Sequence, residues 1–270
     1  MKIIVAIKQV PERDAQLKIA PDGQWIDESE LGYSTNEPDA YALEEALQLK
    51  EKHGGEVVAL CAGPARAASA LRDALARGAD RAIHILDEAT SGEGQAQRDT
   101  LGLARLLAEA IRGEAPDLVL TGLQSDDLGL GQTGVVLAEL LGVPHATLIL
   151  HVEKMEAGIR VKRELEDGWF QQIEMPLPAL LTIQSGGNRL RYATLMGIKK
   201  AKGKELRTIE AAALRAAGAL GDAGAARAAT ATLERVYLPE RQKRTEMLTG
   251  TAAEIAAQLV EKLRTEVRVL

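Results

Sequence analysis

The sequence is poor in the residues that build disulfide frameworks, metal clusters and base-stacking surfaces. A single cysteine, Cys61, among 270 residues excludes an internal disulfide and a cysteine-rich metal site. Aromatic residues make up only 3%, so a surface of rings for stacking nucleic-acid bases is not expected. The formal net charge of −6 also argues against a protein that holds nucleic acid.

Long apolar runs are missing as well. No stretch approaches the ~18 uninterrupted apolar residues that a membrane-spanning helix requires. The apolar stretch between Lys2 and Lys8 is too short for a signal peptide and is expected to form the first strand. With 46% hydrophobic and 27% charged residues, the composition is that of a globular protein. We therefore expect a cytoplasmic protein with no membrane insertion and no nucleic-acid partner.

Motifs of several enzyme classes do not occur. No Gly-x-Gly-x-x-Gly follows the first strand, and there is no Gly-Lys-Ser/Thr phosphate loop. The four histidines lack metal-ligand spacing, and His84 lies in an apolar run typical of a core histidine. Cys61 is interpreted as a small buried hydrophobe rather than a reactive thiol. The chain is thus expected to have no catalytic residues of its own, and an ATP-using ligase or pyrophosphatase is the least favoured alternative.

Residues 2–185 alternate between apolar runs and helical patterns. Alternation at these lengths predicts right-handed crossovers, a parallel sheet of strand order 3-2-1-4-5 and helices on both faces. The expected fold class is therefore α/β, a doubly wound, mostly parallel sheet of the Rossmann-like, adenine-nucleotide-binding type. The predicted strands are 2–7, 56–61, 81–86, 117–121 and 146–153, and the predicted helices are 39–53, 65–77, 97–112 and 130–141.

After residue 185 the sequence no longer alternates between strand and helix patterns, and a hairpin pattern precedes this point. Residues 159–165 and 169–175 flank the turn Glu166-Asp167-Gly168, which predicts an added β-hairpin. Residues 179–184 predict a further strand, whereas residues 188–204 show no clear period.

The end of the sequence differs again. Residues 211–231 contain twelve alanines and are predicted to be mobile or supported by a partner. Thr251 and Glu254 form a capping box, which predicts a final helix to about residue 264. We expect an α/β nucleotide-binding domain at 1–204 and a C-terminal helical arm at 205–270.

The loop after the fourth strand is rich in glycine and small polar residues and runs into a helix. In the predicted strand order it lies beside the end of the first strand, at the switch point where such sheets bind ligands. Exposed N–H groups and the helix dipole favour a phosphate there, and glycines let it approach the backbone. An ordinary turn with a helix cap fits residues 121–134 equally well. Capping alone also explains Asn36 and Asp39 at the start of the first helix.

A basic segment follows the hairpin. Residues 175–204 contain no Asp or Glu but carry six positive charges, in a net acidic protein. An apolar tip ringed by lysines is typical of a docking site for acidic partners. The alternative is that the apolar residues pack on the domain's own core. The candidate docking residues are Leu195, Met196, Ile198, Lys199 and Lys200.

The ordered set of these pieces resembles the beta subunit of the electron-transfer flavoprotein (ETF) family. The resemblance covers about residues 2–204 and resumes at 239–270. Each stretch alone is weak evidence for the family, but the same stretches in this order are specific to it. They are residues 5–11, 36–46, 63–64, 74–82, 122–134, 163–164, 177–179 and 191–202.

The resemblance implies a cofactor arrangement. Family members pair with an alpha subunit that holds most of the FAD, and the beta subunit carries a buried AMP. Glu164 falls where the family places an acidic residue near the flavin interface. The positions implied for AMP are Ala6, Asn36, Ala62, Ser125, Leu128, Gly129, Gly131, Gln132 and Thr133.

The resemblance also implies partners. The arm at 205–270 would wrap the alpha subunit, and Leu195 would dock acyl-CoA and other dehydrogenases. Electrons would pass from these dehydrogenases to a membrane-linked acceptor of the ETF-quinone oxidoreductase type.

Two departures from the family pattern stand in the predicted nucleotide loop and the basic segment. The loop usually has a run of aspartates followed by Asn, and here it holds Asp127, Leu128, Gly129 and Gly131, so two side-chain contacts to the nucleotide are lost. The usual Asn-Glu-Pro-Arg-Tyr is replaced by residues 188–192. Two alternatives remain open: a stand-alone adenine-nucleotide-binding module, and a bifurcating ETF subunit with a second FAD in place of AMP.

Overall fold

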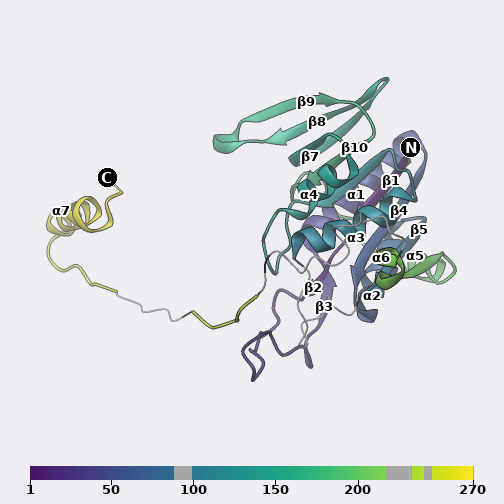
Figure 1. Cartoon of the computed structure of the whole chain (residues 1–270). Helices are drawn as coiled ribbons and strands as arrows, with labels where there is room; N and C mark the ends of the chain where they lie inside the picture. Colours follow the sequence, from purple (N-terminus) through teal and green to yellow (C-terminus); the bar gives the residue numbers. More distant parts are fainter. Residues whose placement is uncertain (88–98, 217–230, 232, 240–244, 270) are drawn as a thin grey trace. The chain divides into compact units, whose positions relative to one another are not determined.

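A nine-stranded sheet with helices on both faces forms the larger part of the computed structural model (Figure 1). The structure describes residues 1–87, 99–216, 231, 233–239 and 245–269, in two units, Met1–Val236 and Tyr237–Leu270. The strands of the sheet are β1 (Lys2–Ala6), β4 (Glu56–Gly63), β5 (Arg81–Leu86), β6 (Leu118–Gly122), β7 (His145–Met155), β8 (Gly158–Glu164), β9 (Phe170–Met175), β10 (Ala179–Ile183) and β11 (Leu206–Glu210).

The remaining elements of the first unit are helices and one small ribbon. The ribbon pairs β2 (Gln9–Pro11) with β3 (Tyr33–Thr35) in antiparallel fashion. The helices are α1 (Glu37–His53), α2 (Ala68–Arg77), α3 (Thr100–Arg112), α4 (Thr133–Leu141), α5 (Leu195–Ala201) and α6 (Ala211–Ala216), with 3-10 turns at Ala65–Ala67 and Glu166–Gly168.

The strand order is β11-β5-β4-β1-β6-β10-β7-β8-β9. Every pair from β11 to β7 is parallel, and β7-β8-β9 is antiparallel. The predicted α/β class, the hairpin and the neighbouring first and fourth strands are therefore confirmed. The predicted contact between the fourth and fifth strands is wrong, because β10 lies between β6 and β7. All five residues of β10 are buried, and such an apolar strand needs a neighbour on each edge and cover on both faces.

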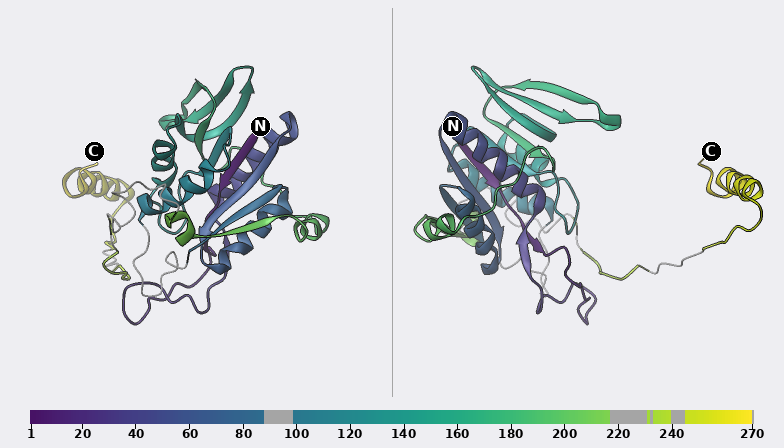
Figure 2. Two further views of the ribbon diagram at one scale, coloured as in Figure 1. Left: turned by 45° about the vertical axis from the view of Figure 1, so that its right-hand side comes forward. Right: turned by 180° about the vertical axis from the view of Figure 1, so that it is seen from behind.

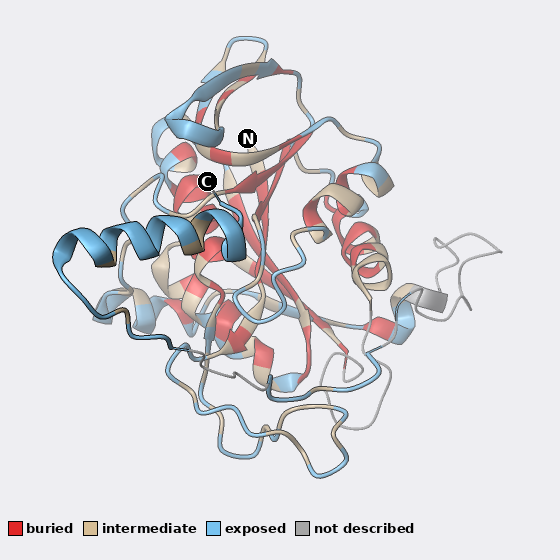
Figure 3. Ribbon diagram, turned by 90° about the vertical axis from the view of Figure 1, so that its left-hand side faces the viewer, coloured by how far each residue is buried: buried red, intermediate tan, exposed pale blue. Residues whose placement is uncertain are grey.

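Helices cover both faces of the sheet (Figure 2), and an apolar layer lies under the helices on each face. Alternate residues of β1 point to opposite faces, so Ile3 and Val5 pack with α1 and α2, while Ile4 packs with α3 and α4. Figure 3 shows the buried positions concentrated on the central strands and on the helix faces that pack against them. Helices on both faces of a parallel sheet are the doubly wound arrangement.

Two helices begin later than predicted, and one short helix was not predicted. The helix predicted at 130–141 begins at Thr133, because Gly129 and Gly131 adopt left-handed backbone conformations that end the loop before it. The helix predicted from residue 97 begins at Thr100, and residues 97–98 lie outside the described ones. Residues 195–201, where no period was visible, form α5.

The sheet continues past the expected domain boundary at residue 204. β11 pairs with β5 at the sheet's edge, and α6 follows it. Most of the alanine-rich stretch, residues 217–230, lies outside the described residues.

The second unit contains helix α7 (Ala252–Lys262), which continues into a π-turn at Leu263–Val267. The capping box predicted at Thr251 and Glu254 is present. In the described part of the chain, no helix is long and apolar enough to cross a membrane.

Candidate functional site

The carboxyl ends of β1 and β6 are tied together by one buried carboxylate, that of Asp39 in the first turn of α1. Its two oxygens accept the backbone N–H of Lys8 and the backbone N–H of Gly122, each at 2.8 Å. Burial raises the pKa of Asp39 to about 6, although both backbone donors oppose that shift. A Cβ on Gly122 would lie 2.5 Å from an Asp39 oxygen, so only glycine lets β6 approach α1 this closely.

Asn36, at the N-cap position of α1, shapes the loop that follows β6. Its amide nitrogen donates to the carbonyl of Gln124 at 3.0 Å, and its amide oxygen accepts from the N–H of Asp126 at 2.9 Å. The side chain is 1% exposed and makes no cap hydrogen bond to its own helix. The sequence interpretation of Asn36 and Asp39 as helix caps is therefore wrong, because both side chains serve the strand ends and the loop instead.

Lys8, two residues after the end of β1, reaches over the same loop. Its ammonium lies 2.6 Å from a carboxylate oxygen of Asp127 and 3.3 Å from the hydroxyl of Ser125. Neighbouring Lys8 holds the pKa of Asp127 below its usual value despite partial burial. Sequence reasoning gave Lys8 no functional role, although its position directly after the strand predicted at 2–7 was the available signal.

The loop ends at an amino terminus of α4 that has no side-chain cap. Gly129 and Gly131 have φ near +60°, and a Cβ at either position would lie no closer than 3.8 Å to another atom. By contrast, a Cβ on Gly134 would lie 2.5 Å from the Thr182 methyl group, so α4 sits tightly on the sheet. The first-turn N–H groups of α4 are thus held at the switch point with a pliable glycine loop beside them.

The predicted nucleotide residues gather at this edge of the sheet. Ala6 ends β1, Ala62 lies near the end of β4, which pairs with β1, and Asn36 holds the loop after β6. Glu164 does not join them, since it ends β8 in the hairpin, where it accepts a hydrogen bond from Gln184 at 3.1 Å. The loop and the start of α4 supply Ser125, Leu128, Gly129, Gly131, Gln132 and Thr133.

The candidate docking residues lie elsewhere, on and around α5. Leu195 is 88% exposed, Met196 62% and Ile198 47%, so none of them belongs to the core. Lys199 and Lys200 are exposed on the same short helix. The segment therefore presents three large apolar side chains and two ammonium groups to solvent.

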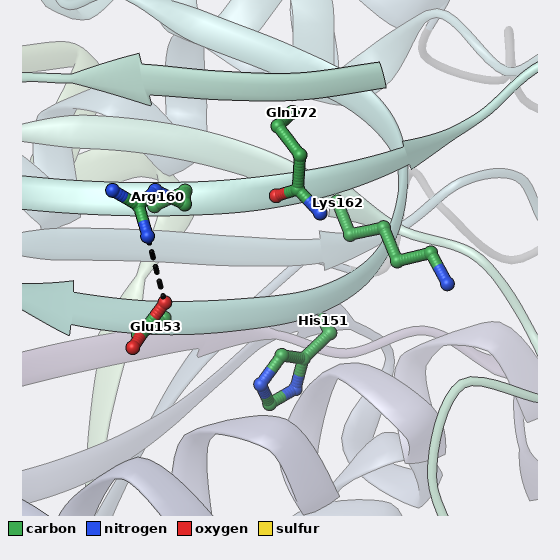
Figure 4. Close-up of a pocket in the computed structure, with 5 residues that line it drawn as sticks. All are labelled: His151, Glu153, Arg160, Lys162 and Gln172. Atoms are coloured by element: carbon green, nitrogen blue, oxygen red, sulfur yellow. Dashed lines mark ion pairs between the residues drawn. The ribbon is translucent and has the colours of Figure 1, made fainter. Parts of the chain in front are cut away.

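An open hollow of about 380 Å³ lies on the antiparallel part of the sheet (Figure 4). Arg160 and Glu153 face each other across neighbouring strands there, 3.5 Å apart. None of the predicted site residues lines this hollow, whose mixed charges and open shape differ from the glycine-rich switch point. Its lining residues are His151, Glu153, Arg160, Lys162 and Gln172.

Other reactive side chains lie in the core. Cys61 is 1% exposed, and burial raises the pKa of its thiol to about 12, which confirms the predicted buried hydrophobe. His84 is 3% exposed and its Nε2 lies 3.0 Å from the carbonyl of Gly63, as expected for a core histidine. No cluster of potential metal ligands occurs among the residues that the structure describes.

The sheet order, the two helical layers and the switch-point loop define a doubly wound, Rossmann-like α/β protein. Residues 24–214 match the electron transfer flavoprotein domain family. The chain belongs to the electron transfer flavoprotein family.

Named relatives are similar over most of their length. An "Electron transfer flavoprotein subunit beta" of Methylophilus methylotrophus is 38% identical, with 97% of each chain covered. The protein of the same name in Bacillus subtilis is 36% identical over the whole of both chains. The mitochondrial one of Oryza sativa subsp. japonica is 37% identical, covering 77% of this chain and 81% of its own. These relatives establish electron transfer flavoprotein subunits as the proteins this chain resembles from end to end.

Proposed function

We propose that this chain is the beta subunit of a heterodimeric ETF, which binds AMP and docks the dehydrogenases that reduce the flavin. The observation that carries the proposal is the full-length similarity to beta subunits, together with a prepared loop at the switch point. The subunit carries electrons through a flavin at the subunit interface and brings no acid–base residues of its own to that task.

AMP fits the carboxyl ends of β1 and β6. Uncapped N–H groups at the start of α4 and the flexible backbone of Gly129 and Gly131 suit a phosphate. Gln132 and Thr133 add side-chain donors beside them. Asn36 acts through the loop, because both polar atoms of its amide already hold the backbone of residues 124 and 126.

Nucleotide content tests this part of the proposal and separates it from the alternatives. The heterodimer purified with its alpha subunit is denatured, and released nucleotides are quantified by chromatography. One AMP and one FAD per heterodimer is the expected result. Two FAD molecules would instead identify the bifurcating type, and neither nucleotide in the beta chain would refute the site.

FAD is held mainly by the alpha subunit, with Glu164 near the interface. The isolated beta chain should then contain little or no FAD. Stoichiometric FAD on the isolated chain would contradict this and would favour a stand-alone nucleotide-binding module.

The arm at the end of the chain is suited to the alpha subunit. Helix α7 is fully described and has no buried residue, and Leu259 and Val260 are 48% and 44% exposed. Limited proteolysis should cleave within residues 205–270 faster in the free chain than in the heterodimer. Equal rates in both forms would count against a wrapping arm. Other exposed apolar residues of this unit are Tyr237, Leu238, Met247, Val267 and Val269.

Leu195 is proposed as the anchor for acyl-CoA and other dehydrogenases, with Lys199 and Lys200 steering acidic surfaces toward it. Leu195→Ala should weaken docking by about 1–3 kcal/mol, the range for losing a buried apolar anchor, while melting temperature and flavin content stay unchanged. Lys199→Glu should mainly slow association at low salt. A large fall in melting temperature with normal electron transfer per folded molecule would contradict the docking role of Leu195.

The final acceptor follows from the same family relation. We propose a cytoplasmic heterodimer that passes electrons to a membrane-linked acceptor of the ETF-quinone oxidoreductase type. Reduced heterodimer should be reoxidised by membrane vesicles that contain such an oxidoreductase and a quinone. Vesicles without the oxidoreductase serve as the control.

A further inference from the structure

Helix α5 buries little apolar surface against the rest of the protein. It has seven residues, and Ala201 is the one buried side chain in it. Isolated helices shorter than ~12 residues are marginal in water, so tertiary contacts must fix this one. Thr194 caps its start, with the hydroxyl accepting the N–H of Gly197 at 3.0 Å. Figure 1 shows α5 beside α2 at one side of the sheet.

The two helices come close together at Gly197. A Cβ at this position would lie 2.3 Å from the carbonyl oxygen of Ala76, in the last turn of α2. Ordinary van der Waals contact begins near 3.4 Å, so any side chain here moves one of the helices by about 1 Å. The bare Cα of Gly197 therefore determines how closely α5 rests on α2.

Hydrogen bonds between α2 and the α5 region run in both directions. Arg72 of α2 donates to the carbonyl of Ala201 at the end of α5, at 3.2 Å. Lys204, just after α5, donates to the carbonyls of Leu75 and Ala79 at the end of α2. The carbonyls of Leu75 and Ala79 lie where α2 ends and can accept from a side chain, whereas the Ala201 carbonyl also accepts the backbone N–H of Lys204 at 3.3 Å. The two elements thus cap each other.

We propose that Gly197 and Lys204 are positioning residues that hold α5 against α2 and so fix the direction in which Leu195 projects. The inference rests on the proposed docking role of Leu195, which would engage a pocket on a dehydrogenase. A rigid apolar anchor binds with less loss of conformational freedom than a mobile one. Helix α2 is then the support of the docking surface without being part of it.

Gly197→Ala tests the positioning role, and Gly203→Ala is its matched control. Gly203 lies in the same segment, but a Cβ there would lie 3.8 Å from the nearest atom, the Lys200 carbonyl oxygen. Both variants are made in the FAD-loaded heterodimer with the alpha subunit. The rate of flavin reduction is measured against the concentration of an acyl-CoA dehydrogenase supplied with its substrate, together with flavin content and melting temperature.

Gly197→Ala should raise the half-saturating dehydrogenase concentration about 10-fold, while the maximal rate and flavin content stay unchanged. Alanine favours helix by up to about 1 kcal/mol over glycine, so local propensity would act in the opposite direction. Gly203→Ala should leave the half-saturating concentration within error of the native value. If Leu195→Ala raises the half-saturating dehydrogenase concentration but Gly197→Ala leaves it at the native value, the inference is overturned. Native behaviour of Leu195→Ala would instead overturn the docking proposal beneath it.

Lys204→Gln gives a second test if Gly197→Ala does not fold. Lys202→Gln removes the same charge from an exposed position of the same segment and so matches its effect on steering. Lys204→Gln should raise the half-saturating concentration several-fold above that of Lys202→Gln, again with an unchanged maximal rate. Equal values for the two variants would show that charge alone matters and would overturn the positioning role.

Discussion

The two ends of strands β1 and β6 are built from opposite chemistry. At the amino end, Glu114 accepts hydrogen bonds from Arg81 at 2.5 Å and from Arg207 at 3.1 Å, with the Lys2 ammonium 3.6 Å away. At the carboxyl end, the Asp39 carboxylate accepts the backbone N–H groups of Lys8 and Gly122, at the start of a glycine-rich loop. Cations surround the buried carboxylate at the first end, whereas backbone donors hold the buried carboxylate at the second end and the Lys8–Asp127 ion pair lies in the neighbouring loop.

The pKa values of the two carboxyl groups shift in opposite directions for this reason. The guanidinium of Arg81 holds the pKa of Glu114 below its usual value of 4.5. Burial without a comparable cation raises the pKa of Asp39 from 3.8 to about 6. The same sheet therefore carries one carboxylate that stabilises the fold at neutral pH and one whose charge is costly there.

The largest expected effect is the pH dependence that Asp39 creates. Because its folded pKa is raised, its contribution to stability is fully present below pH 3.8 and is lost as the pH rises through about 6. Relative to Asp39→Asn, the native chain should lose about 3 kcal/mol of unfolding free energy between pH 3 and pH 8. Urea unfolding of both chains across that range measures it. A constant difference would mean that Asp39 keeps an ordinary pKa.

Glu114→Gln tests the stabilising role of the carboxylate at the amino ends of β1 and β6. Removing the charge leaves Arg81 with Glu56 alone and should cost about 2 kcal/mol of stability at pH 7. Because the pKa of Glu114 is lowered, this difference is present above about pH 4.5 and is lost as the pH falls below it. Urea unfolding at several pH values measures both effects.

Glu174→Gln is the control for this prediction. Glu174 pairs with Arg160 at 2.7 Å, but its side chain is 66% exposed, so its loss should cost no more than about 1 kcal/mol. AMP binding by both variants should equal that of the native chain. Weakened AMP binding by Glu114→Gln would contradict the expectation that the amino ends of β1 and β6 do not affect the nucleotide site at their carboxyl ends.

The smallest expected effect compares two glycines with nearly the same backbone. Gly131 has φ +63° in the loop, and Gly142 has φ +68° before β7, with room for a methyl group at both. Alanine at either position should cost about 1 kcal/mol of unfolding free energy. Only Gly131→Ala should also weaken AMP binding, by about 5-fold, as titration calorimetry of the heterodimer would show. Equal AMP affinity in both variants would remove the loop from the nucleotide site.

Much of the fold was predictable from the sequence, because the hydrophobic periodicity and the glycines at the ends of elements indicate the same helices and strands. The strands at 2–7, 56–61 and 81–86 lie where the structure has β1, β4 and β5. The hairpin around Asp167 and the capping box at Thr251 were equally direct, since each depends on residues adjacent in the chain.

The remaining features depend on contacts between distant residues. The burial of β10 on both faces shows only that it is an interior strand, not which two strands it separates. Asn36 and Asp39 have good capping chemistry, and only the folded sheet shows that the loop after β6 takes up their hydrogen bonds. Helix α5 lacks a periodic stripe, because α2 holds it through Gly197 and Lys204 rather than through an apolar face.

The interior position of β10 determines the order in which the sheet can be completed during synthesis. β6 emerges before β7, yet its outer edge has to wait for residues 179–183, which follow the entire hairpin. If β7 paired with β6 first, it would occupy the place of β10 and would have to leave again. The outer edge of β6 therefore stays unpaired until residue 183 has left the ribosome, and an unpaired apolar strand edge is a place where wrong partners can bind before folding ends.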